Sequence, residues 1–349
     1  MPTTAPGQFV YRAIHPSRAR AAGTKPLDNQ QTLTAFYDLA VSPITFDFVW
    51  FLVGADIERR RRGLANVDIV IVPGPENGLR REQPDYEAVI DPASRRARIF
   101  NILLPACALL PFTRGITLAH SRAHADWIAS SAGESVFPPR YEPKLPRYLG
   151  PAPALDASRG GEQNIAVLRA ADSNLDLVRR WLEQRTAGRR VVTITLRDYA
   201  YMPARNSDLQ AWTAFAHSLD RDRFIPIFIP DTDQCLRALP AALSPFAVCV
   251  EAAWNLGFRM ALYEQAFVNL GVNNGPMGLC WLNERTRYIT FKILSETVPQ
   301  TTRDYMALLG FDVGKSLPFA TPYQKWVWEV DSLAVIQREF DGFLRRVSA

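Results

Sequence analysis

Short apolar runs alternate with segments of helical periodicity throughout the second half of the chain. The strand-like runs are 190–196, 224–229 and 267–272, and the helical segments are 174–184, 207–217 and 257–265. Strands that alternate with helices usually pair in parallel through right-handed crossovers. The alternation therefore predicts an α/β lobe with a parallel, Rossmann-like sheet.

The first half shows the same alternation less regularly. Val67–Val72 is a run rich in β-branched residues, typical of a buried parallel strand, and 115–118 is a second candidate strand. Residues 44–53 read as a buried strand that enters an arginine-rich helix at 55–63, and 99–110 is a further apolar run. These segments predict a second parallel-sheet lobe.

A proline-rich stretch divides the chain. Six prolines lie between Phe137 and Ala154, a density that neither helix nor sheet interior tolerates, so we expect an extended linker. The predicted organisation is an α/β protein with two Rossmann-like parallel-sheet domains facing a cleft. The first domain spans 1–150, the second spans 151–330, and an amphipathic C-terminal helix at 331–349 packs back on the first.

Composition places the chain among globular proteins. It has 349 residues, enough for two domains, with 48% hydrophobic and 21% charged residues and no apolar run of membrane-spanning length. The first 26 residues lack the apolar core of a secretory signal, so a cytoplasmic location is expected. The four cysteines are far apart, which favours buried thiols over a zinc site.

The net charge of +5 includes two basic runs in the first half, Arg59–Arg62 and Arg95–Arg98. Such runs are usually solvated surface. The alternative is a basic patch that meets anionic lipid at the inner membrane face. No nucleic-acid-binding motif accompanies the charge, so nucleic acid is not an expected partner.

The most informative segment for function is the turn after the strand at 267–272. It reads Asn273-Asn274-Gly275-Pro276-Met277-Gly278 and leads into a short helix. Amide N–H groups at a helix start can hold a diphosphate, and small residues let a bulky anion approach them. A tight turn without a ligand is the competing interpretation.

Two such lobes with a linker and a terminal helix resemble the GT-B glycosyltransferases. Between 189 and 293, the order of strand, basic loop, helix containing Trp212, acidic loop and the 271–277 turn is similar to the nucleotide-sugar lobe of heptosyltransferase-like enzymes. Those enzymes usually have Asp-Ser-Gly or Asp-Thr-Gly and then His at the turn, where this chain has Asn274-Gly275-Pro276 and Leu279.

The resemblance implies an inverting, metal-independent glycosyltransferase without a cofactor. It would move a sugar from a nucleotide-diphosphate donor to a glycan, lipid-linked or protein acceptor. A non-catalytic nucleotide- or glycan-binding protein of the same fold is the alternative. Asp231-Thr232-Asp233 matches the letters of a metal-binding DxD motif, but we expect it to serve as a cap or loop.

Donor-binding residues are expected in the second lobe. Arg197 and Arg205 flank a loop that also contains Asn206, and their guanidinium groups suit phosphate oxygens. Arg197 could instead pair with Asp198 on the surface. Glu264, at the end of a helix, could bind ribose hydroxyls or pair with Arg259.

The general base is expected in the first lobe. Glu76 follows the strand 67–72 in a glycine-flanked loop and is the leading candidate, with an exposed turn carboxylate as its alternative. His120 is the second candidate, although His120 and His124 are also consistent with ordinary surface histidines. Asp47, a polar residue in an apolar run, is either a structural carboxylate, which we favour, or a cleft group.

Overall fold

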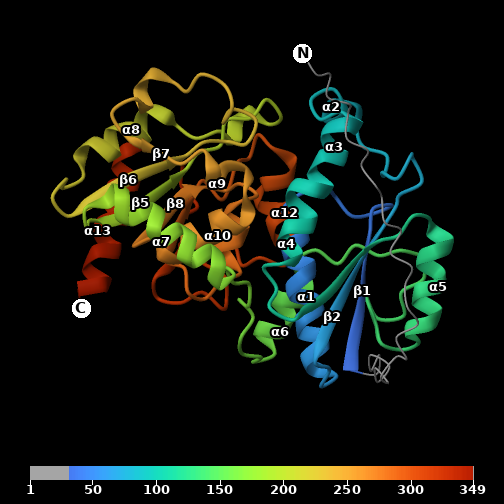
Figure 1. The fold of residues 1–349 in the computed structure, drawn as a ribbon. Helices are drawn as coiled ribbons and strands as arrows, with labels where there is room; N and C mark the ends of the chain where they lie inside the picture. Colours follow the sequence, from blue (N-terminus) through green and yellow to red (C-terminus); the bar gives the residue numbers. More distant parts are fainter. Residues whose placement is uncertain (1–30, 349) are drawn as a thin grey trace, which may run out of the picture.

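The computed structural model describes residues 31–348, which form two lobes side by side (Figure 1). The expectation about a signal at the N-terminus concerns residues outside this range. Each lobe is built on a parallel sheet, so the predicted α/β class with two Rossmann-like domains is confirmed. The sheet orders are β3-β2-β1-β4 in the first lobe and β10-β9-β8-β5-β6-β7 in the second.

The strands of the first lobe are β1 (Thr32–Asp38), β2 (Asn66–Val72), β3 (Thr113–Leu118) and β4 (Val136–Phe137). Its helices are α1 (Phe48–Arg61), α2 (Pro84–Glu87), α3 (Pro92–Arg98), the π-helical turn at Ile99–Leu103, α4 (Leu104–Cys107), α5 (Arg122–Ala132) and α6 (Ala152–Arg159). One face of the sheet packs on α1 and the other on α5.

Three segments of the first lobe differ from expectation. The central strand β1 was missed, and the run 44–53 is a turn followed by α1 rather than a strand. The run 99–110 is helical as far as Cys107. Apolar runs of this length are ambiguous because a helix buried on all sides has no polar stripe, and eleven of the fourteen residues of α1 are buried.

The second lobe has strands β5 (Arg190–Thr195), β6 (Phe224–Ile229), β7 (Ala247–Val248), β8 (Val268–Val272), β9 (Tyr288–Phe291) and β10 (Gln324–Trp326). Its helices are α7 (Asp172–Thr186), α8 (Leu209–Ser218), α9 (Glu251–Trp254), α10 (Leu256–Gln265), α11 (Met277–Trp281), α12 (Arg303–Leu308) and α13 (Leu333–Ser348). Single 3-10 turns lie at Pro203–Arg205, Ala241–Leu243 and Pro299–Thr301. The predicted alternation is confirmed.

The C-terminal helix does not pack on the first lobe, contrary to expectation. Its buried residues Ile336, Phe340 and Phe343 belong to the core of the second lobe, where Phe340 meets Phe215 and Phe224. Figure 1 shows α13 beside α8, on the far side from the first lobe. The apolar stripe of α13 finds its complement in the aromatic cluster over the second sheet, so the helix stays there.

The proline-rich stretch is only partly an extended linker. Residues 152–159 form α6, which packs against α1 in the first lobe. Pro151 and Pro153 stand at the start of this helix, where a missing N–H costs nothing. The chain therefore crosses between the lobes after residue 159, later than the predicted boundary at 150.

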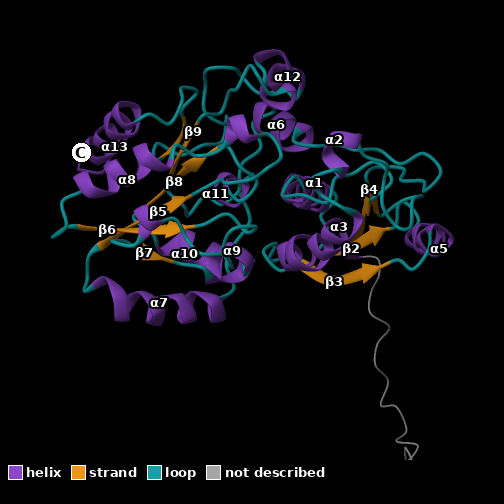
Figure 2. Ribbon diagram, turned by 90° about the horizontal axis from the view of Figure 1, so that it is seen from above, coloured by secondary structure: helices purple, strands orange, loops and turns teal. Residues whose placement is uncertain are grey.

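The lobes share one continuous apolar core. A single cluster of buried residues runs from β1 and α1 to α10 and α11. At the contact, a Cβ on Gly275 would lie 2.7 Å from Phe46 Cδ2, so only glycine allows this approach. Figure 2 shows α11 facing α1. Within residues 31–348 the four cysteines are buried thiols, and no helix is long and apolar enough to cross a membrane.

Candidate functional site

A cleft of about 1090 Å³ lies between the lobes. Its walls come from the turn before α1, the 80–102 segment and Tyr148 in the first lobe. In the second lobe they come from the loops after β5, β6 and β8 and from α9. The carboxyl ends of β5, β6 and β8 thus open into the cleft, which is the usual position of a ligand site in an α/β sheet.

Asp47 lines this cleft at the N-cap of α1. Its side chain does not cap the helix and instead accepts a hydrogen bond from Thr45 Oγ1 at 2.9 Å. The residue is exposed to the cleft, yet protein surrounds it, and this desolvation raises the pKa of the carboxyl. Our preference for a structural role was wrong, because the turn at 43–47 aims Asp47 into the cleft.

Arg205 faces the same space from the second lobe. Its Nη2 donates to the carbonyl of Asn273 at 2.9 Å, whereas its buried Nε has no partner. Burial, with the nearby charge of Arg197, lowers the pKa of Arg205 to about 10, and Asp47 acts in the opposite direction. Arg205 has no ion pair with any residue in 31–348, so its positive charge is available to an anion in the cleft.

Arg197 uses its guanidinium to shape the loop before Arg205. It donates to the carbonyls of Tyr201 and Met202 and to Asn206 Oδ1, and it does not pair with Asp198. Asn206 also binds both backbone groups of Tyr199 at 3.1 Å and does not line the cleft. The structure therefore gives Arg197 and Asn206 a role in fixing the loop.

Only part of the 273–278 turn reaches the cleft. Asn273, Asn274, Gly275 and Pro276 line it, whereas Met277 and Gly278 are buried in the lobe contact. The amide of Met277 is already bound by Asn274, through its carbonyl and its Oδ1, both at 3.2 Å, and the amide of Gly278 by the Gly275 carbonyl at 3.0 Å. These two amides are not free for a diphosphate, which corrects that part of the prediction.

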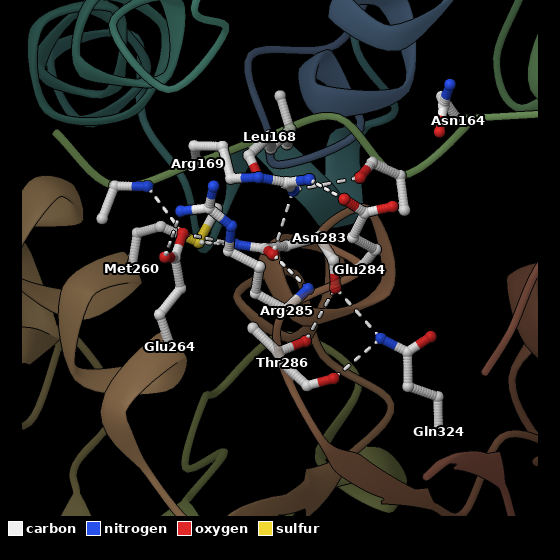
Figure 3. Close-up of polar contacts among 12 residues, drawn as sticks. Asn164, Leu168, Arg169, Met260, Glu264, Asn283, Glu284, Arg285, Thr286 and Gln324 are labelled. Carbon is white, nitrogen blue, oxygen red and sulfur yellow. Dashed lines mark hydrogen bonds and ion pairs between the residues drawn. The ribbon is translucent and has the colours of Figure 1, made fainter. Parts of the chain in front are cut away.

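Glu264 lies outside the cleft, in a closed polar network (Figure 3). Its Oε1 accepts from the amide of Ala170 at 2.8 Å and from Asn283 Nδ2 at 2.7 Å, and Arg285 approaches Oε2 at 3.7 Å. Glu264 thus ties the crossing segment to the second lobe. This position outside the cleft lining does not support the predicted ribose contact, and the partners of Glu264 are Ala170, Asn283 and Arg285 in place of Arg259.

Both candidate bases also lie outside the cleft lining. Glu76 forms an exposed ion pair with Arg81 at 2.9 Å. His120 is exposed and stacks on His124, with ring centroids 4.3 Å apart. The loop after β2 folds into a small hairpin between Gly74 and Leu79, which leaves Glu76 exposed and outside the cleft lining.

Asp231 and Asp233 line the cleft after β6. Asp231 accepts from the amides of Asp198 at 3.2 Å and Asp233 at 3.3 Å, so it holds two loops together, as expected of a loop role. Burial raises the pKa of Asp231. Across residues 31–348, no group of three or more His, Cys, Asp or Glu side chains is arranged to hold a metal ion.

The first basic run is not a free cationic patch. Arg59 and Arg60 pair with Asp56, Arg61 pairs with Glu162, and Arg62 pairs with Glu58. Arg60 also donates to the carbonyls of residues 163 and 164. The run therefore fastens the crossing segment to α1, and acidic partners offset the charge of the basic patch considered as the alternative.

Comparison with solved structures agrees with the architecture. The chain is similar to a glycosyl transferase family 9 protein from Veillonella parvula, with a TM-score of 0.53, 8% identity and 89% of each chain covered. It is also similar to the E. coli ADP-heptose LPS heptosyltransferase II, with a TM-score of 0.52 and 9% identity, over 91% of this chain and 100% of that one.

These likenesses define the class of fold. With two parallel-sheet lobes around a cleft, the chain has the GT-B fold of the glycosyltransferases, as the sequence resemblance implied. No protein-family model and no curated protein sequence matches the chain.

Proposed function

We propose that this protein is a metal-independent glycosyltransferase that uses a nucleotide-diphosphate sugar. The observation that carries the proposal is the position of Asp47 and Arg205 on opposite walls of the cleft. Within residues 31–348 neither forms an ion pair, and each influences the pKa of the other. A base and a cation that face one space are what a transfer to a hydroxyl group requires.

In the proposed reaction, Asp47 takes the proton of an acceptor hydroxyl. The hydroxyl oxygen bonds to the anomeric carbon, while the bond from that carbon to the diphosphate breaks and its electrons leave with the nucleoside diphosphate. Arg205 stabilises the charge that develops on the diphosphate. Attack opposite the leaving group inverts the anomeric centre.

The nucleoside would lie against the loops after β6 and β7. Trp254 lines the cleft there with 58% of its surface exposed, although large aromatic residues are usually covered. Its indole face offers a stacking surface for a base, and Asp233 lines the same cleft. The E. coli enzyme whose fold this chain resembles is named for ADP-heptose. Nucleoside-diphosphate sugars are therefore the first donors to test.

The test has two stages. Thermal unfolding is first followed with nucleoside diphosphates and nucleotide sugars, because a ligand at 100 times its Kd stabilises by about 2.7 kcal/mol. Release of nucleoside diphosphate from the stabilising donor is then measured for wild type and Asp47→Asn. Stabilisation without any release, even with acceptor present, would favour a non-catalytic binding protein of the same fold. The absence of stabilisation by every nucleotide would contradict the proposal.

A further inference from the structure

The cleft contains another arginine without a carboxylate partner, on the first lobe. Arg98, the last residue of α3, donates from Nη1 to the hydroxyl of Tyr86 at 3.4 Å and from Nη2 to the hydroxyl of Tyr199 at 2.8 Å. All three residues line the cleft. Within residues 31–348, Arg98 forms no ion pair.

The two tyrosines are left with protons to donate. Each phenol oxygen accepts from Arg98, and a phenol has one O–H to give. The structure shows no acceptor for either O–H among the described residues. Burial raises the pKa of Tyr86 and of Tyr199, so both remain O–H donors at neutral pH. One cation and two hydroxyl donors therefore converge on a region that lacks an acceptor.

The neighbouring charges do not fill this region. Arg80, on the same wall, is paired with Glu82 at 2.7 Å, so Glu82 is not available to Arg98. Glu87 is paired with Arg95 at 2.9 Å. The negative charge of Asp233, on the opposite lobe, raises the pKa of Tyr199 and would repel an anion bound here. The positive charge of Arg98 acts on the same pKa in the opposite direction and more strongly.

We propose that Arg98, Tyr86 and Tyr199 bind an anionic group of the acceptor, either a phosphate or a carboxylate. The inference rests on the proposed function, which assigns the donor to the second lobe. Arg98 and Tyr86 belong to the first lobe, opposite Arg205, so their ligand is the acceptor. Tyr199 follows β5 in the second lobe, and the site is therefore complete only when the lobes meet.

The competing explanation is that Arg98, Tyr86 and Tyr199 form a structural strut, that is, a contact that only holds the two lobes together. The Tyr86 and Tyr201 rings also meet across the cleft, with centroids 5.2 Å apart, so aromatic packing already joins these segments. A strut needs no anion, and its loss would change lobe contact without changing affinity for a small anionic sugar. This difference makes the two explanations separable.

The experiment uses calorimetry on the full chain with three matched sugars: glucose 6-phosphate, glucuronate and neutral glucose. The variants are Arg98→Ala, Arg98→Lys and the double variant Tyr86→Phe with Tyr199→Phe, which keeps both rings. Arg96→Ala is the control, because Arg96 is exposed on the same helix and does not line the cleft. Arg205→Ala is included to detect phosphate bound at the donor site.

Wild type is expected to bind at least one of the two anionic sugars and not glucose. Arg98→Ala should weaken that binding by about tenfold or more, as expected for a charge-assisted contact. Arg98→Lys and the double tyrosine variant should give smaller losses, and Arg96→Ala and Arg205→Ala should give none. Whether glucose 6-phosphate or glucuronate binds more tightly identifies the anion. All variants are first checked for wild-type thermal unfolding.

Several results would overturn the proposal. Wild type that binds neither anionic sugar, or Arg98→Ala that binds as well as wild type, leaves the strut as the explanation. Binding lost in Arg205→Ala but kept in Arg98→Ala places the phosphate at the donor site. Failure of the proposed function is distinct, because it is seen as a lack of stabilisation by every nucleotide and does not involve the sugars.

Discussion

Two polar clusters of the second lobe differ in how completely their groups are paired. Around Glu264, the oxygen Oε1 accepts two hydrogen bonds, and Arg169, Asn283 and Gln324 close the network between them (Figure 3). At the cleft wall, Arg205 donates one strong hydrogen bond and keeps a buried Nε without a partner. A closed network stabilises the fold, whereas an open one indicates that a ligand supplies the missing partner.

The same contrast separates the carboxylates of the first lobe. Asp38 is buried and accepts from Arg122 at 2.8 Å and from the hydroxyl of Tyr141 at 2.6 Å. Among residues 31–348, Asp47 has only the hydroxyl of Thr45 as a side-chain donor. Asp38 is the last residue of β1, and Asp47 is the N-cap of α1. Of the two carboxylates, only that of Asp47 is free to accept a proton from a ligand in the cleft. The following variants test this comparison, from the largest expected effect to the smallest.

Asp47→Asn should lower sugar transfer by about 100-fold or more, because it removes the base but keeps the shape and the contact with Thr45. Folding raises the pKa of Asp47, so its ionised form opposes folding at pH values above the pKa of the unfolded chain. The variant should therefore unfold at the same or a higher temperature at neutral pH.

The pH profile gives an independent check of the same residue. The wild-type rate should rise with pH through the raised pKa of Asp47 and then level off, and the variant should lack this inflection. Transfer rates measured from pH 4 to pH 8 decide the matter, with thermal unfolding as the control for folding. A variant with the wild-type rate and profile would place the base elsewhere.

Arg205→Ala should weaken donor binding by about 10- to 100-fold, the range for a hydrogen bond to a charged group. Arg205→Lys should recover part of the lost affinity, since it keeps the positive charge but replaces the planar, bidentate guanidinium with an ammonium. Calorimetry with the donor found in the nucleotide screen measures both. Arg285→Ala is the matched control in the same lobe, because Arg285 is largely exposed and outside the cleft lining. Equal donor affinities for wild type and the three variants would contradict the proposed contact between Arg205 and the diphosphate.

Glu264→Ala should lower the free energy of unfolding by about 1 to 3 kcal/mol, because Asn283 and the amide of Ala170 lose their buried acceptor. Urea denaturation measures the loss. Affinity for nucleoside diphosphates should stay unchanged in the folded variant. A variant of normal stability with weakened nucleotide binding would restore the ribose contact predicted from the sequence.

Glu76→Gln should change neither turnover nor donor affinity. It removes an exposed ion pair with Arg81, which costs at most about 1 kcal/mol of stability. His120→Asn should behave likewise, since His120 stacks on His124 outside the cleft. Transfer assays on both variants, run beside Asp47→Asn, make the comparison. A loss of turnover in either variant would place the general base at that residue in place of Asp47.

The sequence was most informative where strands alternate with amphipathic helices. Phe224–Ile229 matches β6 at both ends, and the helix predicted at 257–265 is α10 with one added residue. The run at 44–53 misled because α1 is buried on nearly all sides and so shows no helical polarity. The helix predicted at 207–217 starts two residues later, at Leu209, since Asp208 is the N-cap and accepts from the amide of Ala211.

Of the predicted donor-binding residues, Arg197, Arg205 and the first part of the 273–278 turn line the cleft. Their contact with a donor stays a prediction. Site prediction gave Asp47 as a cleft group only as the less favoured alternative, although a charged residue before a buried helix was a usable signal. It missed Arg98, Tyr86 and Tyr199, which come from three separate segments. No spacing in the sequence brings these segments together.

By itself, the sequence determined the local elements and the parallel α/β class, because helical and strand periodicities are read within a few turns of chain. Tertiary structure decided which polar side chains face the cleft and which are paired. Glu76 and Asp47 both lie near the carboxyl ends of first-lobe strands, yet a small hairpin turns Glu76 outward and the contact of Phe46 with Gly275 brings Asp47 to the second lobe. Orientation across an interface depends on packing between residues more than 200 positions apart, which local patterns do not encode.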